Sequence, residues 1–288
     1  MSTLKNPFAP FDKALAESMA ANIRAALNED IGSGDWTAML LPDSSRVKAK
    51  VIVREQAVLC GAPWFEGAMK QIDTHIDIQW HVAEGDLMAA DTAVCSINGP
   101  ARSVMTAERP ALNFLQLLSG VATATRDYVE LIEGSKASIL DTRKTLPGLR
   151  LAQKYAVRVG GGKNQRIALY DGILIKENHI AAAGSIKAAM DAAHALNAGV
   201  SIQIEVENLD ELKQALDAGA SSVLLDNFTH DALREAVAMT AGRAVLEASG
   251  GVNRDSVRAI ADTGVDRISI GAITKDVRAT DYSLRVID

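Results

Sequence analysis

Apolar and polar positions follow two different rhythms along the chain. Residues 12–28 place apolar side chains from Leu15 to Leu27 at helical spacing, which predicts an amphipathic helix. From Arg46 the apolar residues alternate with polar ones, interrupted by a short helical stretch at 63–72. Alternation of this kind is typical of strands in an antiparallel sheet with one solvated face. The first hundred or so residues therefore predict a small α+β domain.

A long apolar periodicity over residues 105–133 leads out of this region. It breaks near Ser119 and Gly120, so it predicts two helices or one bent helix. Pro110 is expected in the first turn, where the missing N–H of proline does no harm. Arg109, just before this proline, has the pattern of a surface residue when it is considered alone.

After Gly134 the rhythm changes to short apolar runs separated, in the later part, by amphipathic helical stretches. The runs are ASILD, GILIK, SIQIEVE, SVLLD, AVLEAS and DRISIGA. Alternating short buried strands and helices indicate consecutive right-handed βα units with a parallel sheet. The pattern predicts an α/β fold of the (β/α) barrel type for this half of the chain.

Each of these runs ends in residues suited to chemistry or close contact. They are Asp141 with Arg143 and Lys144, Lys176, Glu205 with Glu207, Asp226, Glu247 with Ser249, and Gly271. Because barrel active sites lie at the carboxyl ends of the strands, we expect these residues around one mouth. A structural ion pair is the alternative reading for any one of them.

Charge is concentrated on one wall of this predicted mouth. Residues 143–176 hold eight basic residues and one acid, a net charge of 8 − 1 = +7, in a chain whose total is −6. Arg143, Arg166 and Lys176 are expected to bind an anion, since guanidinium groups pair well with planar carboxylates. Basic residues spaced by four, at 150, 154 and 158, are expected to line the rim or to face solvent.

The acidic and glycine-containing strand ends complete the predicted site. Glu205 and Asp226 are suited to a divalent cation held largely through water and substrate oxygens. The turns EASGGV and SIGAIT precede helices, and backbone amides at such turns bind phosphate. On the residues alone, we expect transfer or cleavage of a phosphorylated sugar.

Composition narrows the class of protein. With 48% hydrophobic residues in 288, the chain is long enough for one large or two moderate domains. Mild acidity and the absence of aromatic platforms argue against nucleic-acid binding. The sequence lacks a signal pattern and an apolar run of about 18 residues, so a cytoplasmic protein without membrane insertion is expected. Cys60 and Cys95 lie in apolar surroundings typical of buried thiols.

Ordered motifs resemble the quinolinate phosphoribosyltransferase family. They are DTRKTLPGLR, KYAVRVGGGKNQR, LIKENHI, EVEN, LLDNF, EASGGV and GVDRISIGAITK, with EDIGSGDWT and AERPALNFLQLLSG nearer the amino terminus. The resemblance covers nearly the whole chain. It implies an amino-terminal α+β open-sandwich domain (1–112), an incomplete (β/α) barrel (113–288) whose last helix may pack back on the first domain, and a homodimer with a shared active site.

The family reaction joins quinolinate to 5-phosphoribosyl 1-pyrophosphate with Mg²⁺, releasing CO₂ and pyrophosphate and giving nicotinate mononucleotide in NAD biosynthesis. By resemblance, Arg143, Arg166 and Lys176 bind the two carboxylates, and Arg109 comes from the partner subunit. Lys144 faces pyrophosphate, while Glu205 and Asp226 lie near the ribose and the metal. The remaining expected substrate contacts are Thr142, Gln165, Ser249, Gly250, Gly251, Gly271 and Ala272.

One position departs from the family motif GGGxNHR. Gln165 replaces the histidine that is frequent before the arginine, and a glutamine amide donates hydrogen bonds but carries no charge. Three other functions stay open: a phosphoribosyltransferase acting on a monocarboxylate, a barrel lyase or aldolase using Lys176 as a Schiff-base nucleophile, and a binding protein without activity.

Overall fold

A computed structural model describes residues 4–287 of the chain. The chain divides into two compact units, and each consists of several segments. Unit 1 comprises residues 1–126, 146–161 and 276–288, and unit 2 comprises residues 127–145 and 162–275. The sequence-based boundary at residue 112 stays a prediction.

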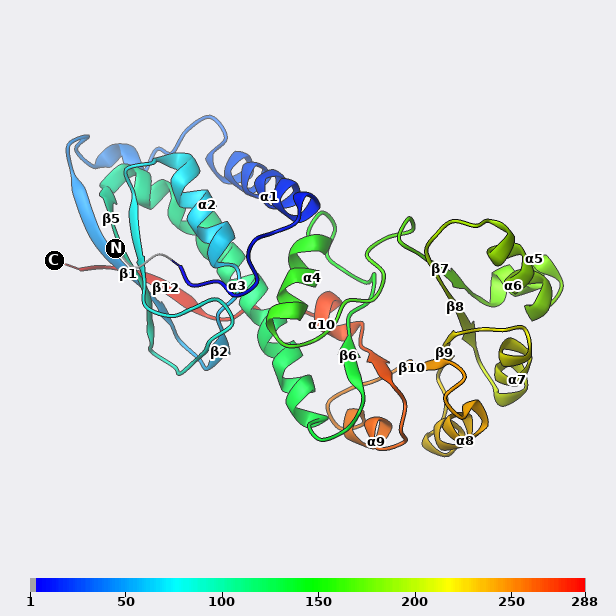
Figure 1. Cartoon of the computed structure of the whole chain (residues 1–288). Coiled ribbons are helices and arrows are strands. Elements are labelled where there is room, and N and C mark those ends of the chain that lie inside the picture. The colour runs from blue at the N-terminus through cyan, green and yellow to red at the C-terminus, as the bar shows by residue number, and fades with distance from the viewer. Residues whose placement is uncertain (1–3, 288) are drawn as a thin grey trace. The chain divides into compact units, whose positions relative to one another are not determined.

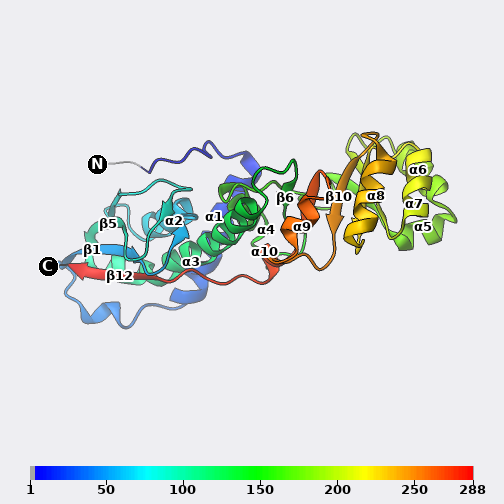
Figure 2. The same cartoon turned by 90° about the horizontal axis from the view of Figure 1, so that it is seen from below.

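Unit 1 contains an antiparallel four-stranded sheet in the order β12-β1-β5-β3, and a separate pair β2-β4 (Figures 1 and 2). Its strands are β1 (Arg46–Val53), β2 (Ala57–Val58), β3 (Asp77–Trp80), β4 (Leu87–Met88), β5 (Ala93–Pro100) and β12 (Tyr282–Ile287). Its helices are α1 (Lys13–Ile31), η1 (Ala38–Leu40), α2 (Ala62–Ile72), α4 (Arg150–Val159) and most of α3 (Ala101–Leu131). This α+β unit confirms the architecture predicted for the amino-terminal region.

Local sequence explains where the first helices begin and how they pack. Asp12 caps α1, because its carboxylate accepts a hydrogen bond from the backbone N–H of Leu15 at 2.8 Å. Helix α2 buries its large apolar side chains, and the ring of Phe65 meets that of Trp80 at 5.7 Å and 73°. Edge-to-face packing of these rings fixes α2 against β3.

Two sequence-based expectations for the helices are wrong. Helix α3 begins at Ala101, so Pro110 lies inside the helix and not in its first turn. Lys154 on α4 is buried, with 2% of its surface exposed, whereas its spacing predicted a rim or solvent position. The predicted helix at 12–28 is confirmed by α1, and both cysteines are buried thiols as expected.

Unit 2 is built on a parallel six-stranded sheet in the order β6-β11-β10-β9-β8-β7, and Figure 1 shows its helices along the outer side. The strands are β6 (Ser138–Leu140), β7 (Gly172–Ile175), β8 (Ser201–Val206), β9 (Ser222–Asp226), β10 (Val245–Ser249) and β11 (Arg267–Ser269). The helices are α5 (Glu177–Ala183), α6 (Ile186–Ala195), α7 (Leu209–Asp217), α8 (His230–Thr240), α9 (Val257–Ala261) and α10 (Ala272–Lys275). The six predicted parallel strands are thus confirmed.

Strands β6 and β7 are the two edges of this sheet, so the barrel is incomplete, as expected. The segment 163–171 runs between these edges. Lys163 forms a parallel bridge with Leu140 at one end. At the other end the Asp171 carboxylate accepts hydrogen bonds from the backbone of Ile167 and Ala168, at 2.7 and 2.8 Å. The segment that follows the glycine-rich motif therefore carries the chain across the opening of the barrel.

The strand register stacks the inward-facing residues in layers. Glu205 pairs with Leu224, Leu224 with Glu247, and Glu247 with Arg267. Because side chains alternate along a strand, residues two positions apart face the same side in successive layers. No helix among residues 4–287 is long and apolar enough to cross a membrane.

Candidate active site

A pocket of about 300 Å³ lies at the carboxyl ends of the parallel strands. Its lining comes from unit 2 and consists of Thr142, Arg143, Lys144, Gln165, Arg166, Leu174, Lys176, Glu205, Leu224, Asp226, Glu247, Ser249 and Ser269. Every strand except β8 contributes through its last residue or the loop that follows it, and β8 contributes through Glu205, its last residue but one. The parallel topology therefore gathers at one edge residues that are up to 127 positions apart, from Thr142 to Ser269.

Two guanidinium groups form the basic wall of this pocket. Burial lowers the pKa of Arg166, and the neighbouring charge of Arg143 lowers it further. Arg166 donates one hydrogen bond to the carbonyl of Gly172 at 3.1 Å, which ties it to the start of β7. Like charges held together in a pocket favour an anionic ligand, because a carboxylate relieves their repulsion.

Lys176 and Glu205 form an ion pair across neighbouring strands. The ammonium nitrogen lies 2.8 and 3.0 Å from the two carboxylate oxygens. The Glu205 side chain is 12% exposed and that of Lys176 is 42% exposed. Lys176 can therefore still donate a hydrogen bond to a ligand in the pocket, whereas Glu205 is the less exposed partner of the pair. A Schiff base would require this amine to leave the ion pair.

Hydrogen bonds of the Lys144 backbone shape the loop on which this residue lies. The hydroxyl of Thr142 accepts a hydrogen bond from the Lys144 N–H at 3.0 Å, and Thr274 donates to the Lys144 carbonyl at 2.8 Å. A Cβ on Gly271 would lie 3.1 Å from Cδ of Lys144, so glycine leaves room for this side chain. The loop after β6 and the loop after β11 thus meet beside the pocket.

The loop after β10 requires glycine at one position. Gly250 has φ of +99°, and a Cβ there would lie 2.1 Å from the amide oxygen of Asn227. The Asn227 N–H also donates to the Ser249 carbonyl at 2.9 Å. A larger residue would separate these two loops.

The acidic side of the pocket has limited capacity for metal ligation. Asp226 accepts a hydrogen bond from the Asn227 amide at 2.7 Å, and Glu205 is paired with Lys176. Residues 4–287 contain no group of three His, Cys, Asp or Glu side chains placed to hold a metal ion. Two hard carboxylate donors suit Mg²⁺ only where water and ligand oxygens complete its shell.

The structure brings most of the predicted site residues to this pocket. Thr142, Arg143, Lys144, Gln165, Arg166, Lys176, Glu205, Asp226 and Ser249 line it. The remaining ones are Gly250, Gly251, Gly271 and Ala272, in adjacent loops, and Arg109, which is exposed on α3 in unit 1. Glu207 was expected to face inward with Glu205 but is exposed beyond the end of β8 and is absent from the lining.

Three lining residues were not predicted, namely Leu174, Leu224 and Ser269, and Glu247 was expected at the mouth as a strand-end residue without a ligand role. Each lies two positions before a predicted strand-end residue, on the same face and one layer deeper. The period-two rule would have found them, had it been applied to every strand. Together they form the floor of the pocket.

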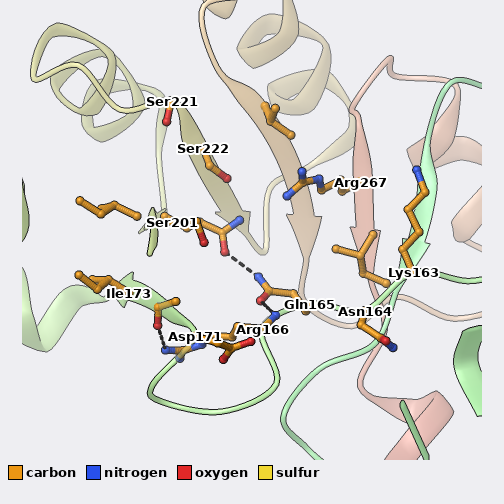
Figure 3. A pocket seen from close by; sticks show the side chains of 15 residues that line it. Lys163, Asn164, Gln165, Arg166, Asp171, Ile173, Ser201, Ser221, Ser222 and Arg267 are labelled. Carbon is orange, nitrogen blue, oxygen red and sulfur yellow. Dashed lines mark hydrogen bonds between the residues drawn. The ribbon is translucent and has the colours of Figure 1, made fainter. Parts of the chain in front are cut away.

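A second cavity, of about 420 Å³, lies at the amino ends of the same strands (Figure 3). Ser201, Ser222 and Arg267 line it, and they occupy the first positions of their strands. Gln165 and Arg166 line both cavities. The segment that spans the barrel opening therefore also separates the two cavities.

Comparison with known proteins places the chain in a family. The profile of the quinolinate phosphoribosyl transferase C-terminal domain matches residues 121–285, and that of the N-terminal domain matches residues 35–119. The chain is 38% identical to a nicotinate-nucleotide pyrophosphorylase (carboxylating) of Mycobacterium leprae, over 91% of this chain and 95% of that protein. It is 35% identical to a chloroplastic protein of the same name from Arabidopsis thaliana, over 93% and 82%.

Solved structures show the same similarity in three dimensions. The nicotinate-nucleotide pyrophosphorylase of Francisella tularensis superimposes with a TM-score of 0.92 at 47% identity, covering 94% of this chain and 96% of that one. The protein of that name from Ehrlichia chaffeensis gives a TM-score of 0.90 at 36% identity. Sequence and fold together lead to one conclusion: the chain belongs to the quinolinate phosphoribosyltransferase family.

Proposed function

We propose that this protein transfers the phosphoribosyl group of 5-phosphoribosyl 1-pyrophosphate to quinolinate and decarboxylates the product. Nicotinate mononucleotide, CO₂ and pyrophosphate result, a step in NAD biosynthesis. The observation that carries the proposal is the joint placement of Arg143, Arg166 and Lys176 around one pocket that the carboxylates of Glu205 and Asp226 also line. Family membership supports the same reaction.

The basic wall accounts for binding of a diacid. Arg143 and Arg166 provide planar donor pairs for carboxylates, and Lys176 adds an ammonium donor. A ligand with one carboxylate would leave part of this charge uncompensated, so the arrangement favours quinolinate over a monocarboxylate. With both carboxylates bound, the pyridine nitrogen is directed toward the ribose carbon.

The acidic side accounts for the transfer step. As the bond from the ribose carbon to pyrophosphate breaks, positive charge grows on that carbon, and the carboxylates of Glu205 and Asp226 stabilise it. Lys144 stabilises the charge that develops on the departing pyrophosphate. The pyridine nitrogen then forms the new bond and becomes cationic, so the adjacent carboxylate leaves as CO₂ and its ring carbon takes up a proton.

A Mg²⁺ ion is part of this proposal. Glu205 and Asp226 would hold it, mainly through water and substrate oxygens, because both carboxylates line the pocket and Glu247 is engaged by Gln203. When bound, Mg²⁺ neutralises charge on the pyrophosphate oxygens. The loops of Ser249–Gly251 and Gly271–Ala272 are proposed to take the 5-phosphate with their backbone amides.

We also propose that the protein is a cytoplasmic homodimer in which Arg109 serves the partner's pocket. Trp36 and Leu40 are 79% and 81% exposed, which is unusual for large apolar side chains outside a contact surface. Their loop is tied to α3, because Thr106 donates a hydrogen bond to Asp35 at 2.9 Å, one turn before Arg109. A second copy that covers this loop would therefore come close to Arg109.

Release of labelled CO₂ tests the proposed reaction. The purified protein is incubated with Mg²⁺, 5-phosphoribosyl 1-pyrophosphate and quinolinate labelled in the carboxylate next to the nitrogen. We expect CO₂ and nicotinate mononucleotide in equal amounts. No release would contradict the proposal, and product formed from nicotinate instead would support the monocarboxylate alternative. Borohydride trapping at Lys176 with a carbonyl compound would indicate a Schiff-base enzyme.

A further inference from the structure

Polar contacts hold part of the floor between the two cavities. Gln203 on β8 and Glu247 on β10 are buried at 7% and 0% exposure. Below them lies the second cavity of about 420 Å³, lined largely by small or polar residues such as Ser201 and Ser222. Gln203 lines this cavity and Glu247 lines the pocket above it, so both are buried polar side chains between the two cavities and need hydrogen-bond partners.

These hydrogen bonds converge on Gln165. Its amide nitrogen donates to the amide oxygen of Gln203 at 2.7 Å and lies 3.3 Å from a carboxylate oxygen of Glu247. The Gln203 amide nitrogen donates to the same Glu247 oxygen at 2.9 Å. The amide oxygen of Gln165 accepts a hydrogen bond from the backbone N–H of Arg166 (Figure 3). Both ends of the Gln165 amide are therefore engaged by the protein.

The network also fixes which way round the Gln165 amide lies. Glu247 accepts hydrogen bonds but cannot donate them when it is ionised, so it orients the amide nitrogens of Gln203 and Gln165 toward itself. The oxygen of Gln165 is then left facing Arg166. A reversed amide would bring two oxygens together at Gln203 or Glu247, which is unfavourable in a buried site.

We infer that Gln203 and Glu247 are positioning residues for substrate: through Gln165 they hold the backbone of Arg166 so that its guanidinium meets a carboxylate of quinolinate. This inference rests on the proposed function. It gives Gln165 an indirect role in place of the direct substrate contact expected from its sequence position. The network should affect the binding of quinolinate and not that of 5-phosphoribosyl 1-pyrophosphate, because Lys144 and the phosphate loops do not take part in it.

Substitution of Gln203 tests the inference, because it should change the KM for one substrate and not the KM for the other. Gln203→Leu removes the amide at similar size and should raise the KM for quinolinate about tenfold, while the KM for 5-phosphoribosyl 1-pyrophosphate changes less than about twofold. Ser222→Ala is the matched control, since Ser222 lines only the lower cavity and should leave both constants unchanged. Binding of benzene-1,2-dicarboxylate, a diacid without a ring nitrogen, measured by calorimetry should weaken in parallel.

A pH series separates positioning from a general loss of structure. In Gln203→Glu the introduced carboxylate lies at hydrogen-bond distance from Glu247, and two carboxylates this close share one proton. The KM for quinolinate should then be near the wild-type value at about pH 6 and rise about tenfold by about pH 8.5, with no such rise in wild type or in Gln203→Leu.

The outcomes are distinguishable. An unchanged KM for quinolinate in folded Gln203→Leu, or no pH dependence in Gln203→Glu, would overturn the inference. If Gln203→Leu fails to melt cooperatively, Gln165→Leu on the loop decides: an unchanged KM for quinolinate would overturn the inference equally. A wild-type protein without turnover would instead contradict the proposed function, before any variant is compared.

Discussion

Two clusters of charged side chains, one buried in unit 1 and one half-buried in unit 2, differ in the partners that neutralise them. In unit 1, Glu84 is 1% exposed and accepts hydrogen bonds from the backbone of Gly61 and Ala62, at 2.8 and 3.1 Å, and from the Tyr155 hydroxyl at 3.0 Å. Its own chain satisfies this carboxylate and uses it to cap α2. In unit 2, Arg143 and Arg166 repel each other beside a pocket.

The difference separates charges that maintain the fold from charges that act on a ligand. Burial raises the pKa of Glu84 to about 7 against the effect of its donors, so the group contributes to stability in a pH-dependent way. The repulsion between the arginines, by contrast, decreases when an anion binds. Removing charge should therefore change stability in unit 1 and activity in unit 2.

The largest expected effect follows from removing one arginine of the pocket. Arg143→Ala or Arg166→Ala should lower kcat/KM about 100- to 1,000-fold, because each guanidinium makes charged hydrogen bonds to a carboxylate. The midpoint of thermal unfolding should stay close to that of the wild type. Steady-state kinetics with quinolinate and a melting curve check both parts, and unchanged kinetics in both variants would mean that the carboxylate assignment is wrong.

Mixing two inactive variants tests whether the unit 2 cluster is completed by another subunit. Arg109→Ala and Lys176→Ala should each be inactive alone. After subunit exchange at equal amounts, half of the dimers are hybrids with one intact site of two, so about a quarter of wild-type activity should return. Mass spectrometry of differently tagged subunits confirms the exchange; exchange without recovered activity would argue against a shared site.

The Glu84 cluster should reveal itself in stability measured against pH. Between pH 4.5 and 7 the unfolded chain loses the Glu84 proton while the folded chain keeps it. The contribution of this group to the free energy of unfolding therefore falls as pH rises, by on the order of 3 kcal/mol. Denaturant unfolding of wild type and Glu84→Gln over this range checks the sign. Parallel curves for the two proteins would contradict this role of Glu84.

The smallest expected effect is at Gln165. Gln165→His should keep the KM for quinolinate within about threefold near pH 8, since a neutral imidazole can still donate toward Gln203 or Glu247. As pH falls through about 6.5 the imidazole gains a proton, and the KM should change in the variant but not in the wild type. Initial rates at five or so pH values measure this; identical pH profiles would show that position 165 is not coupled to the substrate.

The barrel half was well predicted from the sequence, because the apolar run that marks each strand is a local pattern. Short apolar runs mark the strands, and parallel topology then places Lys176, Glu205 and Asp226 at one edge without knowledge of distances. The same rule did not predict which residues separate the two cavities, because the contact of Gln165 with Gln203 joins residues that are 38 positions apart. Only the crossing of the barrel opening by 163–171 brings them together.

Unit 1 was harder to predict for the same reason. Glu84 lies near the end of the alternating run IDTHIDIQWHVAEGD, and nothing in that alternation indicates that this carboxylate is buried. Its burial depends on Gly61 and Tyr155, which are remote in sequence. Lys154 likewise occupies a helical position whose spacing says nothing about what covers it. Periodicity identifies the face of an element, but the neighbour that buries a charge on that face has to be seen.

The return of the chain from the barrel to the first sheet has a consequence for biosynthesis. Strand β12 pairs with β1, for instance Ile287 with Lys48, so the partner of an early strand is translated only after the whole barrel. Until then the growing polypeptide on the ribosome carries β1 with an open edge, which favours association with other chains. A recombinant fragment ending at residue 126 would keep that open edge permanently, and we would not expect it to behave as an independent domain.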